Sequence, residues 1–484
     1  MDTDQYESQE FFNLTQQSAQ KILEIVKEDG FIHVFSHLDA DGITAAGIIG
    51  KMLSKLNSKF RLRITQWVDE KIIDEIVSDK PQLVIFTDFG SNYLELLNEK
   101  VPESKVIILD HHQFSNNVKN DNFLNVNPHI FNIPGATDIS GSGIAYFVAK
   151  VVDIENIDLS PIAIIGALGD MQDKNKLRNL HGLNSIIVKD ALASHLIKVE
   201  KDLMFFGRET RPIHRAIASS NRPFLPGITG DEGASFKFLN NLNIPLKNNK
   251  NWRSLRDLTF EERKTLCSAL ANYLLDKGLH FEIENLIGNV YTLTKEEPHT
   301  ALRDAREFAV LLNSTGRMNR PSLGLSICMG DRGSSLIEAN QILEDYRKNI
   351  NKYLLWVKEE PERMKEFENI YVIYGDNFIN EKIVGTISSI IVSSLQNLEK
   401  PLLAFANVEE ENAAKFSMRT TGFAIQKGVN LGEVMQKAAE KFNGKGGGHN
   451  IAAGAQVPID KIEEFVNLVN ILVGKQIAGT KIGS

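Results

Sequence analysis

The sequence predicts an α/β protein: a mostly parallel sheet in the first domain, a helical insertion and a smaller C-terminal α/β domain. Three observations predict this fold class. Short apolar segments rich in β-branched residues alternate with segments of helical periodicity in the first third of the chain. A charged, irregular stretch interrupts this alternation, and strand-like segments return near the end. The length of 484 residues exceeds what one hydrophobic core usually organises.

Three segments are short and apolar enough to be strands: FIHVFS (31–36), LVIFTDF (83–89) and KVIILD (105–110). The segment GITAAGIIGKMLSKL (42–56) has apolar residues at helical spacing. Polar or glycine-bearing residues follow each strand. Because ligands of open parallel sheets bind at the carboxyl ends of the strands, we expect the functional site there.

The same patterns predict the division of the chain. We expect the first domain at 1–194, the helical insertion at 195–298, and a return to the first domain at 299–345, where 301–331 has a helix-turn-strand pattern. A charged helical connector at 346–368 then leads to the final α/β domain at 369–484.

Composition restricts the class of protein only weakly. Cys267 and Cys328 lie far apart, which indicates two buried thiols in a reducing compartment. The N-terminal segment is acidic, and no stretch approaches ~20 uninterrupted apolar residues, so we expect a cytoplasmic protein without membrane contact. The net charge of -8 neither supports nor excludes a nucleic-acid substrate.

Metal-ligand residue types follow the first expected strand in the segment SHLDADG. Residues two apart in extended backbone point to the same side, roughly 6 to 7 Å apart, so His37, Asp39 and Asp41 can face one cavity. Such a row could hold two divalent ions about 3.5 to 4 Å apart. Gly42 permits a sharp turn into the following helix.

More residues of this kind follow the other expected strands. Asp88 ends the second strand. The third strand ends with Asp110, His111 and His112, and an apolar helix ends with Asp170 and Asp173. Singly, each could cap a helix or lie on the surface. Together, clustered carboxylates cannot all stay ionised without a cation, which indicates a metal site.

The segments HLDADG, TDFGS, ILDHHQ and GALGDMQD resemble, in order, the four motifs of the DHH phosphoesterase superfamily. The resemblance implies one metal site formed by His37, Asp39 and Asp88, and a second formed by Asp41, Asp88, His111 and Asp170. It also implies that His112 faces the scissile phosphate and that Asp110 supports the histidines. His112, Asp41 and Asp88 are then the expected catalytic residues. Carboxylates with imidazole and no thiolate favour two manganese ions, with magnesium as the alternative.

The glycine-rich segment GKGGGHNIAAG (444–454) resembles the GGGH signature of the DHH-associated C-terminal domain, and KFSMRTTG upstream resembles its substrate-binding strand. Glycine amides can approach a phosphate closely, and arginine suits it geometrically. The implied substrate-binding residues are Ser417, Arg419, Lys445, Gly446, Gly447, Gly448 and His449. A flexible loop and a surface salt bridge are the plainer interpretations of the glycines and of Arg419.

Two basic segments carry Arg208, Arg211, His214, Arg215 and Arg222, and then Arg303, Arg306, Arg317 and Arg320. They could line a channel for a nucleic-acid strand, or they could be solvated helix faces or contacts to an acidic partner.

Within the superfamily, the chain is most similar to archaeal RecJ-like proteins of the GINS-associated nuclease type. This resemblance implies a two-metal-dependent 5′-to-3′ exonuclease on single-stranded DNA in replication or repair, with GINS and the replicative helicase as partners. Alternatives are a 3′-to-5′ RNA exonuclease, a phosphodiesterase of short oligonucleotides or cyclic dinucleotides, a pyrophosphatase, and a non-catalytic replisome scaffold.

Overall fold

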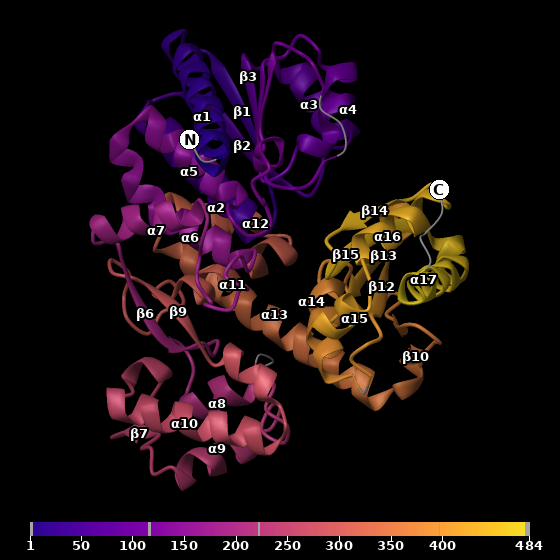
Figure 1. Cartoon of the computed structure of the whole chain (residues 1–484). Helices are drawn as coiled ribbons and strands as arrows, with labels where there is room; N and C mark the ends of the chain where they lie inside the picture. The colour runs from indigo at the N-terminus through magenta and orange to yellow at the C-terminus, as the bar shows by residue number, and fades with distance from the viewer. Residues whose placement is uncertain (1–2, 115–117, 221–222, 396, 480–484) are drawn as a thin grey trace. The chain divides into compact units, whose positions relative to one another are not determined.

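The computed structural model describes residues 3–114, 118–220, 223–395 and 397–479 (Figure 1). The chain divides into two compact units, residues 1–343 and 344–484. The finer division at residues 194, 298, 345 and 368 stays a prediction. The α/β class expected from the sequence is confirmed.

The first unit is built on a five-stranded parallel sheet with the order β2-β1-β3-β4-β5. The three strands expected from the sequence form its centre: β1 (Phe31–His37), β3 (Leu83–Thr87) and β4 (Val106–Leu109). The sequence analysis missed the two edge strands, β2 (Lys59–Thr65) and β5 (Phe123–Val126). Strand β2 alternates basic and apolar residues, and none of its residues is buried. Its sequence therefore resembles a surface segment rather than a strand of the sheet.

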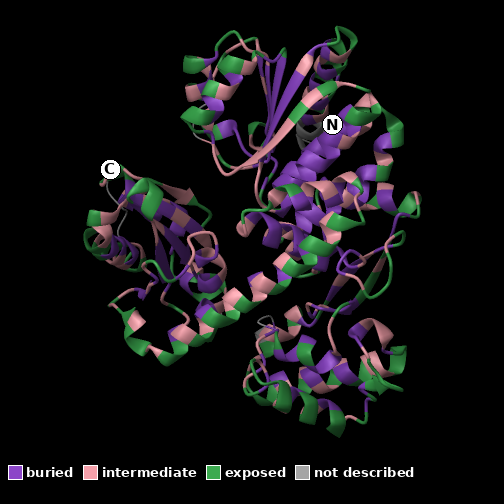
Figure 2. Ribbon diagram, turned by 180° about the vertical axis from the view of Figure 1, so that it is seen from behind, coloured by how far each residue is buried: buried purple, intermediate pink, exposed green. Residues whose placement is uncertain are grey.

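Helices cover both faces of this sheet, because side chains of successive strand residues point to opposite faces. Val34 of β1 packs with α1 (Thr3–Lys27), α2 (Ala40–Lys55) and α5 (Gly141–Val152), whereas Phe35 packs with α3 (Glu70–Asp79) and α4 (Leu94–Lys100). Helix α2 lies between α5 and α6 (Ser160–Gly169) and is almost entirely buried (Figure 2). Helix α7 (Asn184–Ala193) packs on α6.

Residues 301–331 differ from the expected helix-turn-strand pattern. They form two helices, α11 (Ala305–Arg317) and α12 (Pro321–Met329), and no strand. Pro321 begins α12 at a position where its missing N–H is not needed, and Gly330 ends the helix in the left-handed conformation, with φ of 117°. A short apolar run such as SLGLSICM fits a strand or a buried helix equally well, which explains the error.

Within the first unit, an antiparallel pair, β6 (Ile197–Leu203) and β9 (Ile287–Leu293), connects an inserted segment to the rest of the unit. Between these strands lie α8 (Ile213–Ala218), α9 (Glu232–Asn241), α10 (Phe260–Asp276) and a small hairpin of β7 (Lys247–Asn248) and β8 (Asn251–Trp252). These elements enclose a separate hydrophobic core that includes Leu239, Leu266 and Leu270. The segment between β6 and β9 thus forms a module with its own core.

Helix α13 (Ser334–Glu359) carries the chain into the second unit, whose sheet has the order β10-β11-β12-β13-β15-β14. Its strands are β10 (Met364–Glu366), β11 (Tyr371–Tyr374), β12 (Leu402–Val408), β13 (Ala413–Arg419), β14 (Lys445–Gly448) and β15 (Ala452–Pro458). Its helices are α14 (Val384–Ile391), α15 (Gly422–Gln426), α16 (Leu431–Glu440) and α17 (Ile462–Ile477).

Cys267 and Cys328 are both free thiols, and Cys328 is buried as expected, whereas Cys267 is only partly buried. None of the helices in the described stretches has both the length and the apolar character that a bilayer crossing requires.

Helix α2 is the buried centre of the first unit, so truncating its side chains should cost stability. Ile48 is fully buried, and we expect Ile48→Ala to lower the free energy of unfolding by about 2 to 5 kcal/mol. Val77→Ala is the matched control, because Val77 is 53% exposed and should change the value by less than about 1 kcal/mol. Urea unfolding followed by circular dichroism measures both. Equal effects of the two substitutions would contradict this description of the core.

Candidate metal centre

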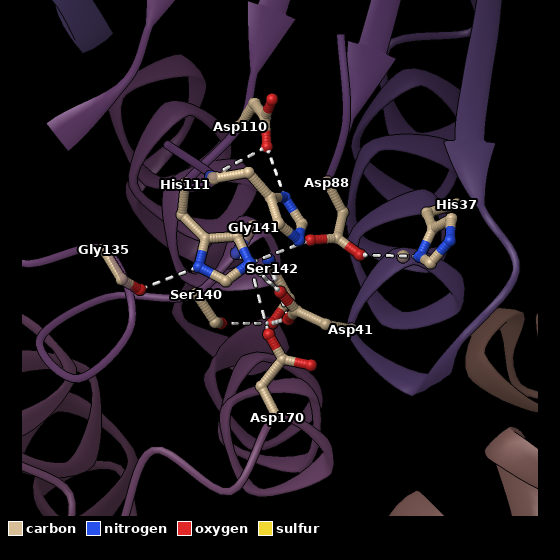
Figure 3. Close-up of polar contacts among 12 residues, drawn as sticks. His37, Asp41, Asp88, Asp110, His111, Gly135, Ser140, Gly141, Ser142 and Asp170 are labelled. Carbon is tan, nitrogen blue, oxygen red and sulfur yellow. Dashed lines mark hydrogen bonds and ion pairs between the residues drawn. The ribbon is translucent and has the colours of Figure 1, made fainter. Parts of the chain in front are cut away.

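The acidic and imidazole residues predicted from the sequence gather at the carboxyl edge of the parallel sheet (Figure 3). His37 ends β1, Asp88 follows β3, and His111 follows β4. Asp39 caps the N-terminus of α2, Asp41 lies in its first turn, and Asp170 caps the C-terminus of α6. Three strand ends and two helix ends therefore supply one cluster.

The cluster contains two groups that share one residue. His37, Asp39 and Asp88 form the first group, and Asp41, Asp88, His111 and Asp170 form the second. Within each group the ligand atoms lie within 4.8 Å of one another. These are the two sets implied by the resemblance, now brought together in space. That metal ions bind there stays a prediction.

Asp88 joins the two groups. Its Oδ1 lies 3.1 Å from Nε2 of His111 and its Oδ2 lies 3.5 Å from Nδ1 of His37, so that one oxygen faces each group. The residue is 1% exposed and has a φ of 63°, in the left-handed region that few residues other than glycine adopt. Such a strained conformation is typical of functional sites. An added Cβ at Gly141 would come within 2.7 Å of the Asp88 Cβ, so the glycine is required by this close approach.

Asp41 is held by the N-terminus of α5. Its Oδ2 accepts a hydrogen bond of 2.6 Å from the Gly141 amide, and its Oδ1 accepts one of 3.0 Å from the Ser142 amide and another from the Ser142 hydroxyl. Free amides and the dipole at a helix N-terminus stabilise a carboxylate. These hydrogen bonds therefore hold the Asp41 carboxylate in one orientation in a fully buried position.

The ring of His111 is oriented by a backbone carbonyl. Its Nδ1 donates a 2.7 Å hydrogen bond to the oxygen of Gly135, since a carbonyl only accepts. In the neutral ring this leaves the lone pair of Nε2 directed at the carboxylates, 3.1 Å from Asp88 and 3.2 Å from Asp170. A histidine fixed in this way is ready to bind a metal ion.

Asp170 stands where a negative charge is disfavoured. It caps the C-terminus of α6, where the helix dipole is negative. Burial and the nearby charge of Asp41 raise the pKa of Asp170 above the ordinary aspartate value. Burial, together with Asp41 and Asp39, raises the pKa of Asp88 well above that value. Although burial lowers the pKa of His111, these carboxylates outweigh it and raise that pKa well above the ordinary histidine value.

The donor set fits divalent cations. Within the described part of the chain, no hydrogen bond reaches either carboxylate oxygen of Asp88, Nδ1 of His37 or Nε2 of His111, although all four atoms are buried. Buried polar atoms of this kind are rarely left without partners. Carboxylate oxygens and imidazole nitrogens without thiolate suit manganese or magnesium.

His112 and Asp110 form a pair beside the cluster. Asp110 Oδ1 lies 2.8 Å from Nδ1 of His112 and accepts a 3.1 Å hydrogen bond from its amide, and Oδ2 accepts one of 3.0 Å from the Ser91 amide. Burial and His111 lower the pKa of His112, but Asp110 outweighs them and the pKa is raised overall. The His112 side chain is 40% exposed, so its ring can meet a ligand from solvent.

Sequence reasoning missed the residues that position this cluster. Gly166 has no room for a side chain, because an added Cβ would overlap the Asp41 carboxylate and the hydroxyls of Ser142 and Thr44. Gln172 donates hydrogen bonds of 2.9 and 3.1 Å to the carbonyls of Gly135 and Ile139 and so fixes the loop that orients His111. The run SGSG (140–143) before an apolar helix was a readable sign of a helix N-terminus that could hold an anion.

In the second unit, the expected substrate-binding residues lie on β13 and on β14 or directly after it, and β15 lies between these two strands. Ser417 of β13 is in register with Gly454 of β15, which is in register with Gly447 of β14. A Cβ at Gly447 would meet nothing within 4 Å, whereas one at Gly446 would strike the backbone of Met435 in α16. The glycine tract is thus a paired strand with one open position and one tightly packed position, and the flexible-loop alternative is wrong.

Arg419 ends β13, on the same side as Ser417. Its Nε donates a 2.8 Å hydrogen bond to the hydroxyl of Ser389 in α14, and its Nη1 donates one of 2.8 Å to the backbone carbonyl of Met418. Lys445 and Gly448 begin and end β14, Lys445 is exposed, and the amide of His449 bonds to the carbonyl of Ala452 at 2.8 Å. The arginine is therefore oriented by its neighbours at the edge of the open strand face.

The expected basic channel receives little support, because many of its members bind their own chain. Arg306 pairs with the buried Asp173, Arg208 pairs with Asp202 at 2.6 Å, and Arg303 donates to backbone carbonyls. Other pairs are Arg215–Glu232, Arg211–Ser219 and Arg320–Glu338, and Arg317 also has a partner. Arg222 lies outside the described residues. Of these arginines, Arg208 and Arg306 are bound to buried acids of the fold.

Three family models match successive parts of the chain. The DHH family N-terminal domain matches residues 31–169, the DHH-CID domain matches 205–287, and the DHHA1 domain matches 369–475. The first match contains the cluster up to the residue before Asp170, and the third contains Ser417, Arg419 and the glycine strand.

Whole-chain relatives agree with these matches. A protein of unassigned function from Methanocaldococcus jannaschii is 33% identical over 469 residues, covering 95% of this chain and 98% of its own. The fold is similar to RecJ of Thermus thermophilus in complex with Mn²⁺, with a TM-score of 0.59 and 16% identity over 96% of this chain and 55% of RecJ, so the chain spans about half of that enzyme. It is also similar to CDC45 of Entamoeba histolytica, with a TM-score of 0.65 and 12% identity over 95% of this chain and 99% of CDC45.

The cluster at the sheet edge, the open glycine strand and these matches together show that the chain belongs to the DHH superfamily and has a RecJ-like fold.

Proposed function

We propose that this protein is a two-metal-dependent phosphodiesterase that degrades single-stranded nucleic acid as an exonuclease, with single-stranded DNA in the 5′-to-3′ direction as the first substrate to test. The hydrolase fold and the acidic cluster support the general class. The substrate and direction rest on the resemblance to RecJ-like nucleases.

One observation carries the proposal. The carboxylate of Asp88 is buried between two ligand groups, and neither oxygen has a hydrogen-bond partner in the described structure. A carboxylate in that position is costly unless each oxygen meets a cation. We therefore propose that His37 and Asp39 complete one metal site and that Asp41, His111 and Asp170 complete the other.

Two divalent cations, manganese by preference, would supply a hydroxide-like water and neutralise charge on the phosphoryl oxygens. The chain itself supplies orientation and proton transfer. Asp110 holds Nδ1 of His112, which leaves the other ring nitrogen to stabilise a phosphoryl oxygen or to protonate the leaving oxygen. Asp41 and His111 are held by the α5 N-terminus and by Gly135, so that they need little reorganisation.

The second unit would bind the nucleic acid near the end of the strand. Arg419 lies on β13 two residues beyond Ser417, which shares a register line with the open position at Gly447, and its guanidinium is suited to bind a phosphate. Ser417, Lys445, Gly446, Gly448 and His449 complete the proposed surface.

A non-catalytic scaffold is the second candidate, because the fold is similar to CDC45 of Entamoeba histolytica. The complete, geometrically gathered donor set favours catalysis over this alternative. A phosphodiesterase of short oligonucleotides, a 3′-to-5′ RNA exonuclease, partnership with GINS and the replicative helicase, and a cytoplasmic location stay predictions.

The first prediction concerns metal binding. Gly166→Ala would push a methyl group into the Asp41 carboxylate, so we expect it to weaken Mn²⁺ binding at least about ten-fold in isothermal titration calorimetry. Gly422→Ala is the matched control, because nothing lies within 4 Å of an added Cβ there. Unchanged Mn²⁺ affinity in a folded Gly166→Ala protein would argue against Asp41 as a ligand.

The second prediction concerns hydrolysis. Asp88→Asn removes the charge shared by both groups, so Mn²⁺-dependent release of nucleotides from a labelled single strand should fall by about 10³-fold or more. The exposed Asp121→Asn, near β5 and outside the cluster, should leave the rate unchanged. DNA and RNA strands labelled at either end resolve direction and sugar preference in the same assay. Release of mononucleotides only from dinucleotides would replace this proposal with the short-oligonucleotide alternative.

The third prediction separates binding from chemistry. Arg419→Ala should raise KM about ten-fold and change kcat by less than about three-fold, because the guanidinium would bind substrate equally in the ground and transition states. Arg363→Ala, another partly exposed arginine of the second unit, serves as the control. A loss confined to kcat would contradict a binding role for Arg419.

A further inference from the structure

The hairpin of β7 and β8 is an exposed feature of the inserted module (Figure 1). Its sequence is KNNKNW, from Lys247 to Trp252, and all six residues are exposed. Lys247 pairs with Trp252 and Asn248 with Asn251, and Asn249 turns the chain with φ of 54°. The hairpin thus projects polar and basic side chains into solvent.

The base of this hairpin is firmly anchored. The guanidinium of Arg253 donates to the carbonyls of Pro245 and Asp257, at 2.8 and 2.7 Å, and to the carboxylate of Glu262 at 2.6 Å. The Arg253 amide bonds to the carbonyl of Leu246, and the Ile213 amide bonds to the carbonyl of Arg253. An exposed hairpin on such a base presents its side chains in a fixed arrangement.

Aromatic rings surround one face of the hairpin. Trp252 is 45% exposed, and Phe236 of α9, 38% exposed, lies 6.4 Å from it between ring centroids. His214 of α8 lies 4.8 Å from Trp252 and 5.7 Å from Phe236. His214 is only 7% exposed, yet its Nδ1 has no hydrogen-bond partner among the described residues. Two half-open rings therefore flank a buried histidine with an unused nitrogen.

The positive charge of the hairpin is not neutralised. Lys247 Nζ lies 4.3 Å from the Trp252 ring centroid. In the described structure no carboxylate forms an ion pair with Lys247 or Lys250, and the hairpin contains no acidic residue. Burial lowers the pKa of His214, and the charge of Glu232 opposes this effect. Glu232 is already paired with Arg215 at 3.1 Å.

We propose that this aromatic and basic face, formed by Phe236, Lys247, Lys250 and Trp252, is a second binding surface for single-stranded nucleic acid. Bases stack on exposed rings, and lysines contact the phosphates between them. Protein interfaces, by contrast, are depleted in lysine at their centre and need an apolar core, which the hairpin lacks. The inference extends the proposed function, since it takes from that function only the class of ligand.

Binding without hydrolysis tests the proposal. Trp67→Phe with Trp356→Phe leaves Trp252 as the only tryptophan of the full chain. In EDTA, titration with 30-nucleotide oligo(dT) or oligo(U) should quench its fluorescence. Lys247→Glu with Lys250→Glu should weaken binding of the labelled strand about five-fold or more by fluorescence anisotropy, and added salt should reduce that difference.

The controls come from the same module. Lys264→Glu and Phe260→Ala alter an exposed lysine and a 72% exposed ring on α10, and neither should change affinity more than about two-fold. Trp252→Phe should retain more affinity than Trp252→Ala. Unchanged affinity in the double lysine variant, or quenching by an acidic peptide with none by oligonucleotides, overturns the inference. If strand binding at the hairpin occurs without Mn²⁺-dependent hydrolysis, the proposed function fails and this inference stands. If Mn²⁺-dependent hydrolysis occurs without strand binding at the hairpin, this inference fails and the proposed function stands.

Discussion

The arrangement of the first unit depends on the electrostatics of one buried carboxylate. Asp88 is 1% exposed, lies among other acids, and receives no hydrogen bond on either oxygen within the described structure. Its backbone is also in the left-handed region. Each of these features costs free energy, and the proposed cations on the two sides of Asp88 would offset the electrostatic part.

Two helix ends, the N-terminus of α5 and the C-terminus of α6, have opposite effects on the carboxylates of this centre. The N-terminus of α5 satisfies Asp41 with two amides and a hydroxyl, so that the orientation of this carboxylate is fixed. The C-terminus of α6 does the reverse for Asp170, because its dipole adds negative charge beside a carboxylate. The cluster therefore combines one carboxylate that is satisfied by the protein with others whose pKa is raised by burial and by neighbouring acids, a combination that a bound cation would relieve.

Much of this could be predicted from the sequence, and the limits have physical causes. The ends of β1, β3 and β4 were readable because central parallel strands are continuous apolar runs, and the acids that follow them must converge at one sheet edge. Strand β2 was missed because its alternating arginines read as surface. Residues 321–329 were misread because a short apolar run has no distinctive period.

The supporting residues were beyond sequence reasoning for a different reason. Gly135, Gly166 and Gln172 act through contacts with residues distant in the chain, and a single glycine or glutamine carries no sign of such a contact. The arginines showed the opposite error. Arg208 and Arg306 looked like a substrate channel by composition, but their buried acid partners Asp202 and Asp173 could be identified only in three dimensions.

Fold similarity alone does not decide between a nuclease and a scaffold, because RecJ of Thermus thermophilus and CDC45 of Entamoeba histolytica both match nearly the whole chain. The electrostatics of the cluster gives an independent argument. A buried carboxylate among other acids and without a hydrogen bond destabilises a protein, and a neutral or apolar replacement would relieve that cost in a chain that needed only the fold. This chain keeps four aspartates and two histidines directed at one another. The retention of this donor set therefore supports the proposed metal-dependent activity over the scaffold alternative.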